Sequence, residues 1–322
     1  MGDVISASSD RARTLEKIEI SVQGKWIEAP ALWVDGQPLV VTGKKIRIVS
    51  LHDEEWLEEE LKNPEECLRR LAADHRELRA DIFAFSQKAP STSPRYKYPY
   101  ELRSVAVAEV SNFKTWWESL PQETRKNVRR AQKRGVTLQV RSFDADVIEG
   151  IAGVQNESPI RQGRRYPHFG KSLEQVKRDH GAFVDRSDFI CAYFGEEFIG
   201  CLKLVYRGNI ASILQLNSKS AHYDKRPSNA LIAKAAELCE SRGITHLIYG
   251  RFNYGVQAQS ALKEFKERHG FAEMLLPAYY VPLTNWGKLC LRLKLHHGMT
   301  QFIPKGLLSR ALDLRAKWYT AK

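Results

Sequence analysis

The stretch HYDKRPSNALIAKAAELCESRGITHLIYGRFNYGVQAQSALKEFKERHGF, residues 222–271, decides the fold that the sequence predicts. Apolar residues recur at helical spacing from about Ser228 or Asn229, both good N-cap residues, and Gly243 ends the predicted helix. Residues 244–249 are short, apolar and β-branched, so they predict a buried strand. A second helix, closed by Gly270, follows a loop. The chain is therefore expected to be built around a helix–strand–helix unit.

A basic turn precedes the first of these helices. Lys225 and Arg226 lie at a helix start, where free N–H groups and the helix dipole favour an anion. A phosphate there gains roughly 0.3–1 kcal/mol from the dipole at an exposed site. An ordinary capped helix with two solvated basic residues gives the same pattern. The turn alone favours this ordinary interpretation.

Length, charge and cysteine usage limit the class of protein. The chain has 322 residues and a net charge of +12, and its length favours two domains or two halves that share an interface. The five cysteines are scattered and form no CxxC motif, which indicates buried thiols in a reducing compartment and no metal site. No apolar run is long enough to span a bilayer and no signal-peptide core is present, so a cytoplasmic location is predicted.

The first part of the chain alternates in a way that predicts strands. Residues 1–13 are small and polar and are expected to form a loose tail, whereas residues 17–50 alternate between apolar and polar positions. The acidic run at 53–66 indicates a solvated helix face, and a helical stripe continues to about Lys88. Residues 89–99 contain three prolines and predict a loop. Its tyrosines can line a cleft or, more commonly, cover a sheet edge.

A basic helix is predicted to end at Gly135. Leu120, Thr124, Val128 and Ala131 form a narrow apolar stripe, and six cations occupy the rest of this helix. The cations can form a basic wall that faces a phosphorylated substrate or RNA. They can equally be solvated and pair with the acidic run at 53–66. Both interpretations remain open from the sequence.

These stretches resemble the FemAB-like acyltransferases, which share the fold of the GNAT N-acetyltransferases, and the acetyltransferase-like domains of the CelD type. The family pattern is an aromatic turn, a Ser/Pro-Asn pair, a helix, Gly, a strand ending in Gly-Arg, then Phe-Lys and Gly. Its counterparts here are Tyr223, Ser228-Asn229, Gly243, Gly250-Arg251, Phe265-Lys266 and Gly270. The basic helix also resembles the family's Arg-x-x-Val-Arg-Arg-Ala segment. A GNAT-style Gly-rich phosphate loop is not present in the sequence.

The resemblance implies an α/β fold with a mixed α+β sheet and two GNAT-like halves, of which the second is the more complete. The expected boundaries are a tail at 1–13, a first half at 14–142, a second and catalytic half at 143–285, and a basic tail at 286–322. The resemblance also implies that the strands at 210–217 and 244–249 splay apart, and that donor and acceptor meet in the gap.

Donor and acceptor residues follow from the resemblance. The expected donor-binding residues are Lys225, Arg226, Ser228 and Asn229 at the helix start, with Gln215 and Asn217 on the central strand. A segment similar to the family's Thr/Ser-x-x-Arg-Gln-Gly supplies the acceptor-binding residues Arg161 and Gln162. The remaining substrate-binding candidates are Arg164, Arg251 and Lys266.

A general base is harder to assign. No carboxylate lies on the strand at 210–217, so water-mediated or substrate-assisted proton removal is favoured over a dedicated base. Glu157 and His168 are the candidates for a protein base, and Tyr254 is the candidate acid. No Ser, Cys and His residues form a recognisable triad, so no covalent intermediate is expected.

Three functions follow. The leading one is an N-acyltransferase that moves an acyl group from an acyl-CoA thioester to an amine of a sugar, amino acid or envelope precursor. The second is an aminoacyl-tRNA-dependent transferase, as in family members that build cell-wall cross-bridges. The net charge favours it, but the long helical hairpin of several such enzymes has no counterpart. The third is a non-catalytic module that binds RNA or anionic lipid. None of the three requires a metal.

The basic tail suggests one more partner. Residues 286–322 contain eight Lys or Arg and one Asp, and residues 307–315 predict a basic amphipathic helix. Such a helix can contact anionic lipid at the inner membrane surface. It can also pack on the domain with its lysines solvated, and this alternative is slightly favoured.

Overall fold

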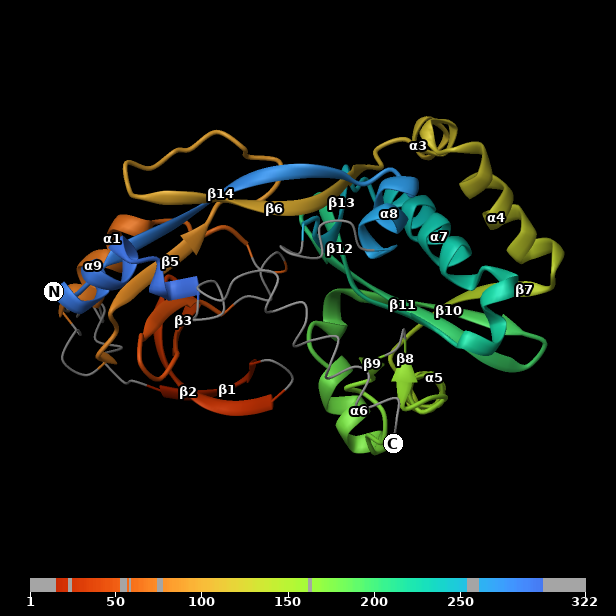
Figure 1. The fold of residues 1–322 in the computed structure, drawn as a ribbon, viewed down its shortest axis with the longest axis horizontal. Helices are drawn as coiled ribbons and strands as arrows, with labels where there is room; N and C mark the ends of the chain where they lie inside the picture. Colours follow the sequence, from red (N-terminus) through yellow and green to blue (C-terminus); the bar gives the residue numbers. More distant parts are fainter. Residues whose placement is uncertain are drawn as a thin grey trace, which may run out of the picture.

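The computed structural model describes residues 16–22, 25–52, 57, 59–73, 78–161, 164–253 and 261–297. These residues form one twelve-stranded mixed sheet, in the order β1-β2-β3-β4-β5-β14-β6-β13-β12-β11-β10-β7, and a separate ribbon of β8 and β9 (Figure 1). The strands of the large sheet are β1 (Glu16–Val22), β2 (Lys25–Val34), β3 (Gln37–Thr42), β4 (Ile48–Leu51), β5 (Ile82–Ser86), β6 (Tyr100–Glu109), β7 (Val136–Arg141), β10 (Ser187–Phe194), β11 (Glu197–Arg207), β12 (Ile210–Ser218), β13 (His246–Arg251) and β14 (Ala272–Pro282).

Helices cover this sheet. They are α1 (Pro64–Ala73), α3 (Phe113–Ser119), α4 (Gln122–Lys133), α5 (Ala145–Gln155), α6 (Leu173–His180), α7 (Pro227–Ser241), α8 (Ala261–Arg268) and α9 (Asn285–Arg292). In the second half, α7 lies on one face of the sheet and α5 and α6 lie on the other (Figure 1). None of the described helices is both long and apolar enough to cross a membrane.

The first four strands confirm the pattern expected for residues 17–50. They pair in sequence as antiparallel neighbours, and the β2–β3 turn has positive φ angles of 49° at Asp35 and 76° at Gly36. Two consecutive positive φ angles suit the right-handed twist of a tight hairpin, and an Asp-Gly pair adopts them readily. The hairpins are therefore determined locally.

The predicted helix up to Lys88 is wrong from residue 79 onward. Ile82 and Phe85 belong to β5, which lies between β4 and β14 in the sheet. Four of the five β5 residues are buried, because the strand is covered on both faces. Such a strand is apolar throughout and shows no period of two, so it is easily taken for a helical stripe.

Tyr96 of the proline-rich loop covers two interior strands, β5 and β14, and not the sheet edge that was predicted. The Tyr96 ring lies 5.4 Å from Phe85 and 5.3 Å from Tyr279, both edge-on. The backbone N–H of Arg95 donates to the hydroxyl of Tyr279 at 2.9 Å. The loop is thus held against the core of the first half.

The helix at the centre of the sequence begins one residue earlier than predicted. Pro227 opens α7, and Arg226, with φ of 60°, is its N-cap. Ser228 and Asn229 lie inside the first turn and are not caps, because proline is well suited to the first helical position. Gly243, with φ of 68°, follows the end of α7 as expected. The buried face of α7 includes four fully buried residues, Leu231, Ile232, Ala235 and Ala236.

The end of the described chain returns to the first half. The expected closing strands are one strand, β14, which pairs with both β5 and β6. Conversely, β7 precedes the expected boundary at 142/143 but pairs with β10, a strand of the second half. One continuous sheet therefore joins the two halves (Figure 1), and the domain boundaries stay predictions. The tail at 1–13 and the amphipathic helix at 307–315 lie outside the described residues.

Candidate functional site

The two central strands of the second half separate as expected. β12 and β13 pair in parallel at three positions, from Ile210 with His246 to Ser212 with Ile248. Beyond Ser212 a bulge distorts the pairing of β12 with β11, and Arg251 of β13 pairs with Val105 of β6. The edge of β12 from residue 213 to 218 therefore faces β13 without ladder hydrogen bonds in the described structure. Its backbone groups can serve a bound carbonyl.

The residues predicted to bind the donor gather at the start of α7, where several have partners within the protein. The Ser228 hydroxyl lies 2.9 Å from that of Ser218 at the end of β12. The Asn229 amide nitrogen lies 3.0 Å from Nε2 of His269. The Lys225 ammonium lies 3.3 Å from Asp224 and 4.7 Å from the centre of the Phe194 ring. These contacts fix the turn, and the donor-binding role stays a prediction.

Glu157 anchors the turn between β12 and α7. Its carboxylate accepts hydrogen bonds from the backbone N–H groups of Ser220 at 2.6 Å and Ala221 at 2.9 Å, at the start of the 3-10 helix η2 (Ser220–Lys225). Burial opposes its charge, but these two donors and nearby Arg161 outweigh burial and lower the pKa of Glu157. A carboxylate held in this way favours a structural role over the predicted role as a base.

Arg161 is also held from several sides. Its guanidinium donates to the carbonyl oxygen of Val154, lies 3.5 Å from that of Ser218, and stacks 4.3 Å from the centre of the Tyr166 ring. Tyr166 in turn donates to Asn217 at 3.3 Å. Arg161 belongs to the ribbon of β8 (Ile160–Arg161) and β9 (Arg164–Arg165). Gln162 and the side chain of Arg164 lie outside the described part of the chain.

His168 is placed near this ribbon in a setting that keeps it neutral. Its Nδ1 lies 3.2 Å from the ammonium of Lys171. Burial, and then the positive charge of Lys171, lowers the pKa of His168. The ring can accept a hydrogen bond, but Lys171 already occupies this nitrogen. The candidate acid Tyr254 lies outside the described residues.

Gln215 and Asn217 face away from the start of α7. Both line a gap of about 10 Å³ beneath α5 and α6, beside Lys203 and His180. A gap of this size is too small for a substrate and holds one water at most. The structure therefore does not bring these two side chains together with the basic turn.

Lys266 and Arg251 connect α8 to the end of β13. The Lys266 ammonium donates to the Arg251 carbonyl at 2.7 Å and lies 4.6 Å from the centre of the Tyr249 ring. Lys266 is fully buried, and burial lowers its pKa to about 8. Its position suits an anchor of α8. Arg251 differs, because its exposed side chain reaches a large cavity.

This cavity, of about 400 Å³, lies where β4, β5, β6, β13 and β14 meet. Its cationic side chains are Lys88, Arg103 and Arg251, and two histidines extend the same wall. No Asp or Glu is among the described residues that line it. Burial, and then the charges of Arg207 and Arg103, lowers the pKa of Lys88 to about 7. The cavity therefore combines positive charge with a lysine that can give up its proton near neutral pH.

Most of this cavity was not predicted from the sequence. Only Arg251 was predicted as a site residue, on the basis of the Gly-Arg strand end. Lys88 and Arg103 come from the end of β5 and from β6, and neither belongs to a motif. Their convergence depends on the pairing of β14 with both strands, which brings distant parts of the chain together.

The basic helix α4 does not pair with the described acidic residues of the run at 53–66. Glu60 pairs with Arg95 at 2.6 Å, and Glu66 pairs with Arg69 and Arg70. The interpretation that α4 pairs with these two carboxylates is therefore wrong. Arg129 of α4 lies 5.5 Å from the centre of the Trp117 ring. The remaining alternatives for α4 are a solvated helix or a binding surface.

Comparison with known proteins supports the fold. No family model matches the sequence, and no curated protein sequence matches it as a relative. FemX is 11% identical over 81% of this chain and 87% of that chain, with a TM-score of 0.54. L-PGS from Bacillus licheniformis is 14% identical over 78% and 83%, with a TM-score of 0.53.

A third solved structure agrees with these two. It is the C-terminal domain of a proposed lysylphosphatidylglycerol synthetase from Agrobacterium fabrum, which is 12% identical over 82% of this chain and 87% of that chain, with a TM-score of 0.55. At these identities the similarity concerns the fold alone. The chain has a mixed α/β fold like that of FemX, in agreement with the FemAB-like fold that its sequence predicts.

Proposed function

We propose that this chain transfers an acyl or aminoacyl group to an acceptor that carries a phosphate or carboxylate group. The observation that carries the proposal is the cationic cavity at the junction of the two halves, next to strands that separate after three pairs. The name lysylphosphatidylglycerol synthetase describes the joining of a lysyl group to a phosphate-bearing lipid. A protein described by that name has this fold, which supports the proposal without identifying the acceptor here.

The cavity is suited to hold the acceptor. Arg103 donates to the hydroxyl of Tyr280 at 3.2 Å, which orients its guanidinium in the cavity wall. Arginine binds phosphate and carboxylate groups through two parallel hydrogen bonds. Arg251, which follows the last residue of β13 that pairs with β12, also lines the cavity. The acceptor would therefore lie next to the gap between β12 and β13.

The chain supplies a base for the proposed reaction. The acceptor amine attacks the donor carbonyl carbon, and the bond from this carbon to the thioester sulfur or to the ribose oxygen of tRNA breaks. Lys88 in its neutral form takes the proton of the amine, and solvent protonates the leaving group. A lysine with a pKa of about 7 is matched to proton transfer at neutral pH. Backbone N–H groups of β12 polarise the carbonyl.

Two donors fit different parts of the structure. Acyl-CoA is the leading candidate, with Lys225 and Arg226 at the start of α7 facing its phosphates. Aminoacyl-tRNA is the second candidate, and α4 favours it. Its exposed Lys126, Arg129 and Lys133 form a cationic surface beside Trp117, as expected for a surface that contacts a nucleic-acid backbone.

The experiment offers both donors in parallel. The full chain is incubated with a small-molecule extract and either labelled acetyl-CoA or labelled aminoacyl-tRNA, and transfer of label into stable small products is measured. We expect transfer from one donor, reduced at least about tenfold in Arg103→Gln because one charged hydrogen bond contributes about 1.5–3 kcal/mol. Arg69→Gln on α1 is the matched control and should behave as the native chain. Transfer from neither donor, or equal transfer by Arg103→Gln, would contradict the proposal.

A further inference from the structure

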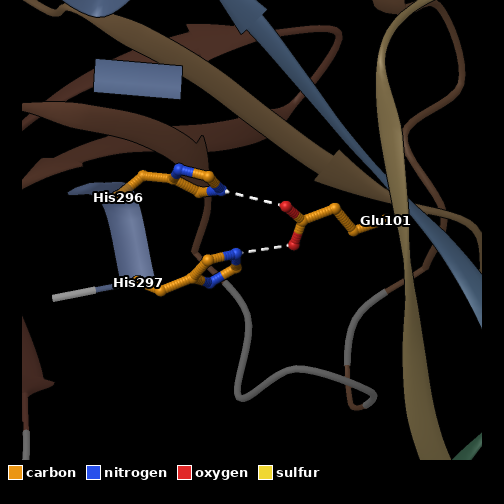
Figure 2. A group of neighbouring side chains, drawn as sticks. All are labelled: Glu101, His296 and His297. Carbon is orange, nitrogen blue, oxygen red and sulfur yellow. Dashed lines mark ion pairs between the residues drawn. The ribbon is translucent and has the colours of Figure 1, made fainter. Parts of the chain in front are cut away.

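Three potential metal ligands converge beside the cationic cavity, and two of them, His296 and His297, line it. Glu101 comes from β6, and His296 and His297 come from the 3-10 helix η4 (Leu295–His297). Figure 2 shows both imidazole rings directed at the same carboxylate, with His297 Nε2 at 2.6 Å from Oε2 and His296 Nε2 at 3.5 Å from Oε1. One ligand atom of each residue lies within 4.8 Å of the other two.

His296 supplies a second and independent observation. Its side chain is 3% exposed, and its Nε2 has an ion-pair contact with Glu101 at 3.5 Å but no shorter hydrogen bond within the described part of the chain. So long a contact satisfies the buried nitrogen poorly, and a buried polar nitrogen left unsatisfied costs roughly 1–3 kcal/mol. The ring is held in place by Tyr280, whose centre lies 4.7 Å from it. His296 is therefore held with its Nε2 directed toward Glu101, where an ion would satisfy it.

We propose that Glu101, His296 and His297 bind one divalent transition-metal ion, with Zn²⁺ as the first choice. Two imidazole nitrogens and one carboxylate oxygen form a common set of protein ligands for Zn²⁺. Bonds of about 2.0–2.1 Å in a tetrahedral site place neighbouring ligand atoms about 3.3 Å apart. The Nε2 of His296 lies 3.5 Å from Oε1, close to this spacing, whereas the Nε2 of His297 lies 2.6 Å from the other oxygen, Oε2. To bind through one oxygen, the carboxylate would have to turn and move away from His297.

The positions of the three ligands indicate the role of the ion. Two separate parts of the chain, β6 and η4, would be clamped together by it. Three protein ligands leave one position of a tetrahedral site open, and both histidines line the cavity, so this position faces the cavity. Arg103, two residues from Glu101, carries a positive charge that repels a metal cation. The affinity for the ion therefore has to come from its bonds to the three ligands. The inference does not rest on the proposed acyl transfer.

The first test measures zinc binding to the untagged full chain after chelator treatment, by competition with a chromophoric zinc indicator. We expect one tightly bound Zn²⁺ per chain. His296→Gln and Glu101→Gln should each weaken it by more than the roughly 10–100-fold loss that follows removal of an outer partner of a metal ligand. His222→Gln is the matched control, because His222 faces Glu197 at 3.0 Å without a second imidazole in that pair. Equal affinity of all four chains would overturn the proposal.

The second test needs no variant and so does not depend on how the variants fold. Co²⁺ is added to the chelated chain, and the visible absorption spectrum is recorded. We expect the intense bands of a four-coordinate site at one equivalent, bleached by one equivalent of Zn²⁺. Weak bands of six-coordinate Co²⁺, or bands that persist after Zn²⁺ is added, would overturn the proposal.

Discussion

Lys88 is a nearly buried lysine that lies close to other positive charges. It is 7% exposed, and Arg207 and Arg103 add positive charge to the cost of burial. Its pKa is lowered to about 7 in the folded chain, against about 10.4 in an unfolded one. Between these values the unfolded chain binds more protons than the folded one. The free energy of unfolding therefore rises with pH from about 7 to about 10.

Replacing Lys88 by Met removes this titration. We expect Lys88→Met to be more stable than the native chain at pH 6, and the difference to shrink as the pH rises toward 10. Each pKa unit corresponds to about 1.4 kcal/mol, so the effect is measurable by urea unfolding over this range. Lys114→Met, at an exposed position, serves as the control. If the free energy of unfolding depended on pH equally in Lys88→Met and in the native chain, the pKa of Lys88 would not be lowered by folding.

Glu157 is the second residue with a defined prediction. Its carboxylate satisfies two backbone N–H groups, and Glu157→Gln keeps the shape but removes the charge and places an amide N–H₂ beside those donors. We expect a loss of about 1–3 kcal/mol in the free energy of unfolding at pH 7. Because the folded pKa is lowered, the loss should disappear as the pH falls below this pKa.

Urea unfolding at a series of pH values from 7 downward measures this effect. Glu149→Gln on the exposed side of α5 is the matched control and should unfold as the native chain does. A stability of Glu157→Gln equal to that of the native chain at pH 7 would mean that the carboxylate does not anchor the turn.

At the scale of elements, the start of α7 shows what the sequence can and cannot predict. The helix, its glycine end and the strand after it follow from apolar spacing, and all three are present. The N-cap was misassigned, because Ser228 and Asn229 are good caps by residue type but Pro227 fixes the first helical position. Likewise β5 was read as helix, because a strand covered on both faces has no alternation.

A substitution at the start of α7 is expected to change stability and donor binding in opposite directions. Arg226 has φ of 60°, a conformation that costs an L-residue roughly 1–2 kcal/mol and costs glycine little. We expect Arg226→Gly to raise the free energy of unfolding by about 0.5–1 kcal/mol and to weaken the binding of coenzyme A. Asp35→Gly, at φ of 49° in the β2–β3 turn, is the control and should leave this binding unchanged.

Thermal unfolding and calorimetric titration with coenzyme A measure the two effects. A variant that gains stability but keeps the native affinity for coenzyme A would remove Arg226 from the donor site. If the native chain does not bind coenzyme A at all, the acyl-CoA donor is excluded and aminoacyl-tRNA remains.

At the scale of the whole molecule, the continuous sheet explains why the candidate site was only partly predictable. The splayed strands and the basic turn lie within one stretch of the sequence, so a family resemblance could indicate them. The cavity instead combines Lys88, Arg103, Arg251 and the η4 histidines, which are separated by long stretches of chain. Their meeting depends on β14 crossing to β5 and β6, a pairing that no local pattern specifies.

The same holds for Glu101, His296 and His297. Scattered cysteines gave no reason to expect a metal, and two adjacent histidines without a spaced partner are not a metal motif. Only the three-dimensional arrangement brings the carboxylate of β6 to the histidines (Figure 2). Sites assembled across a sheet are therefore the part of this protein that sequence patterns could not provide.

The most direct test of the central claim is calorimetric titration of the full chain with inorganic pyrophosphate, a probe for phosphate-bearing acceptors. We predict saturable binding that weakens at least about tenfold in Arg103→Gln, because a charged hydrogen bond is lost. Arg69→Gln, on α1 outside the cavity, should keep the native affinity. Equal affinity of all three chains, or loss in Arg69→Gln alone, would contradict an anion-binding cavity at the junction of the two halves.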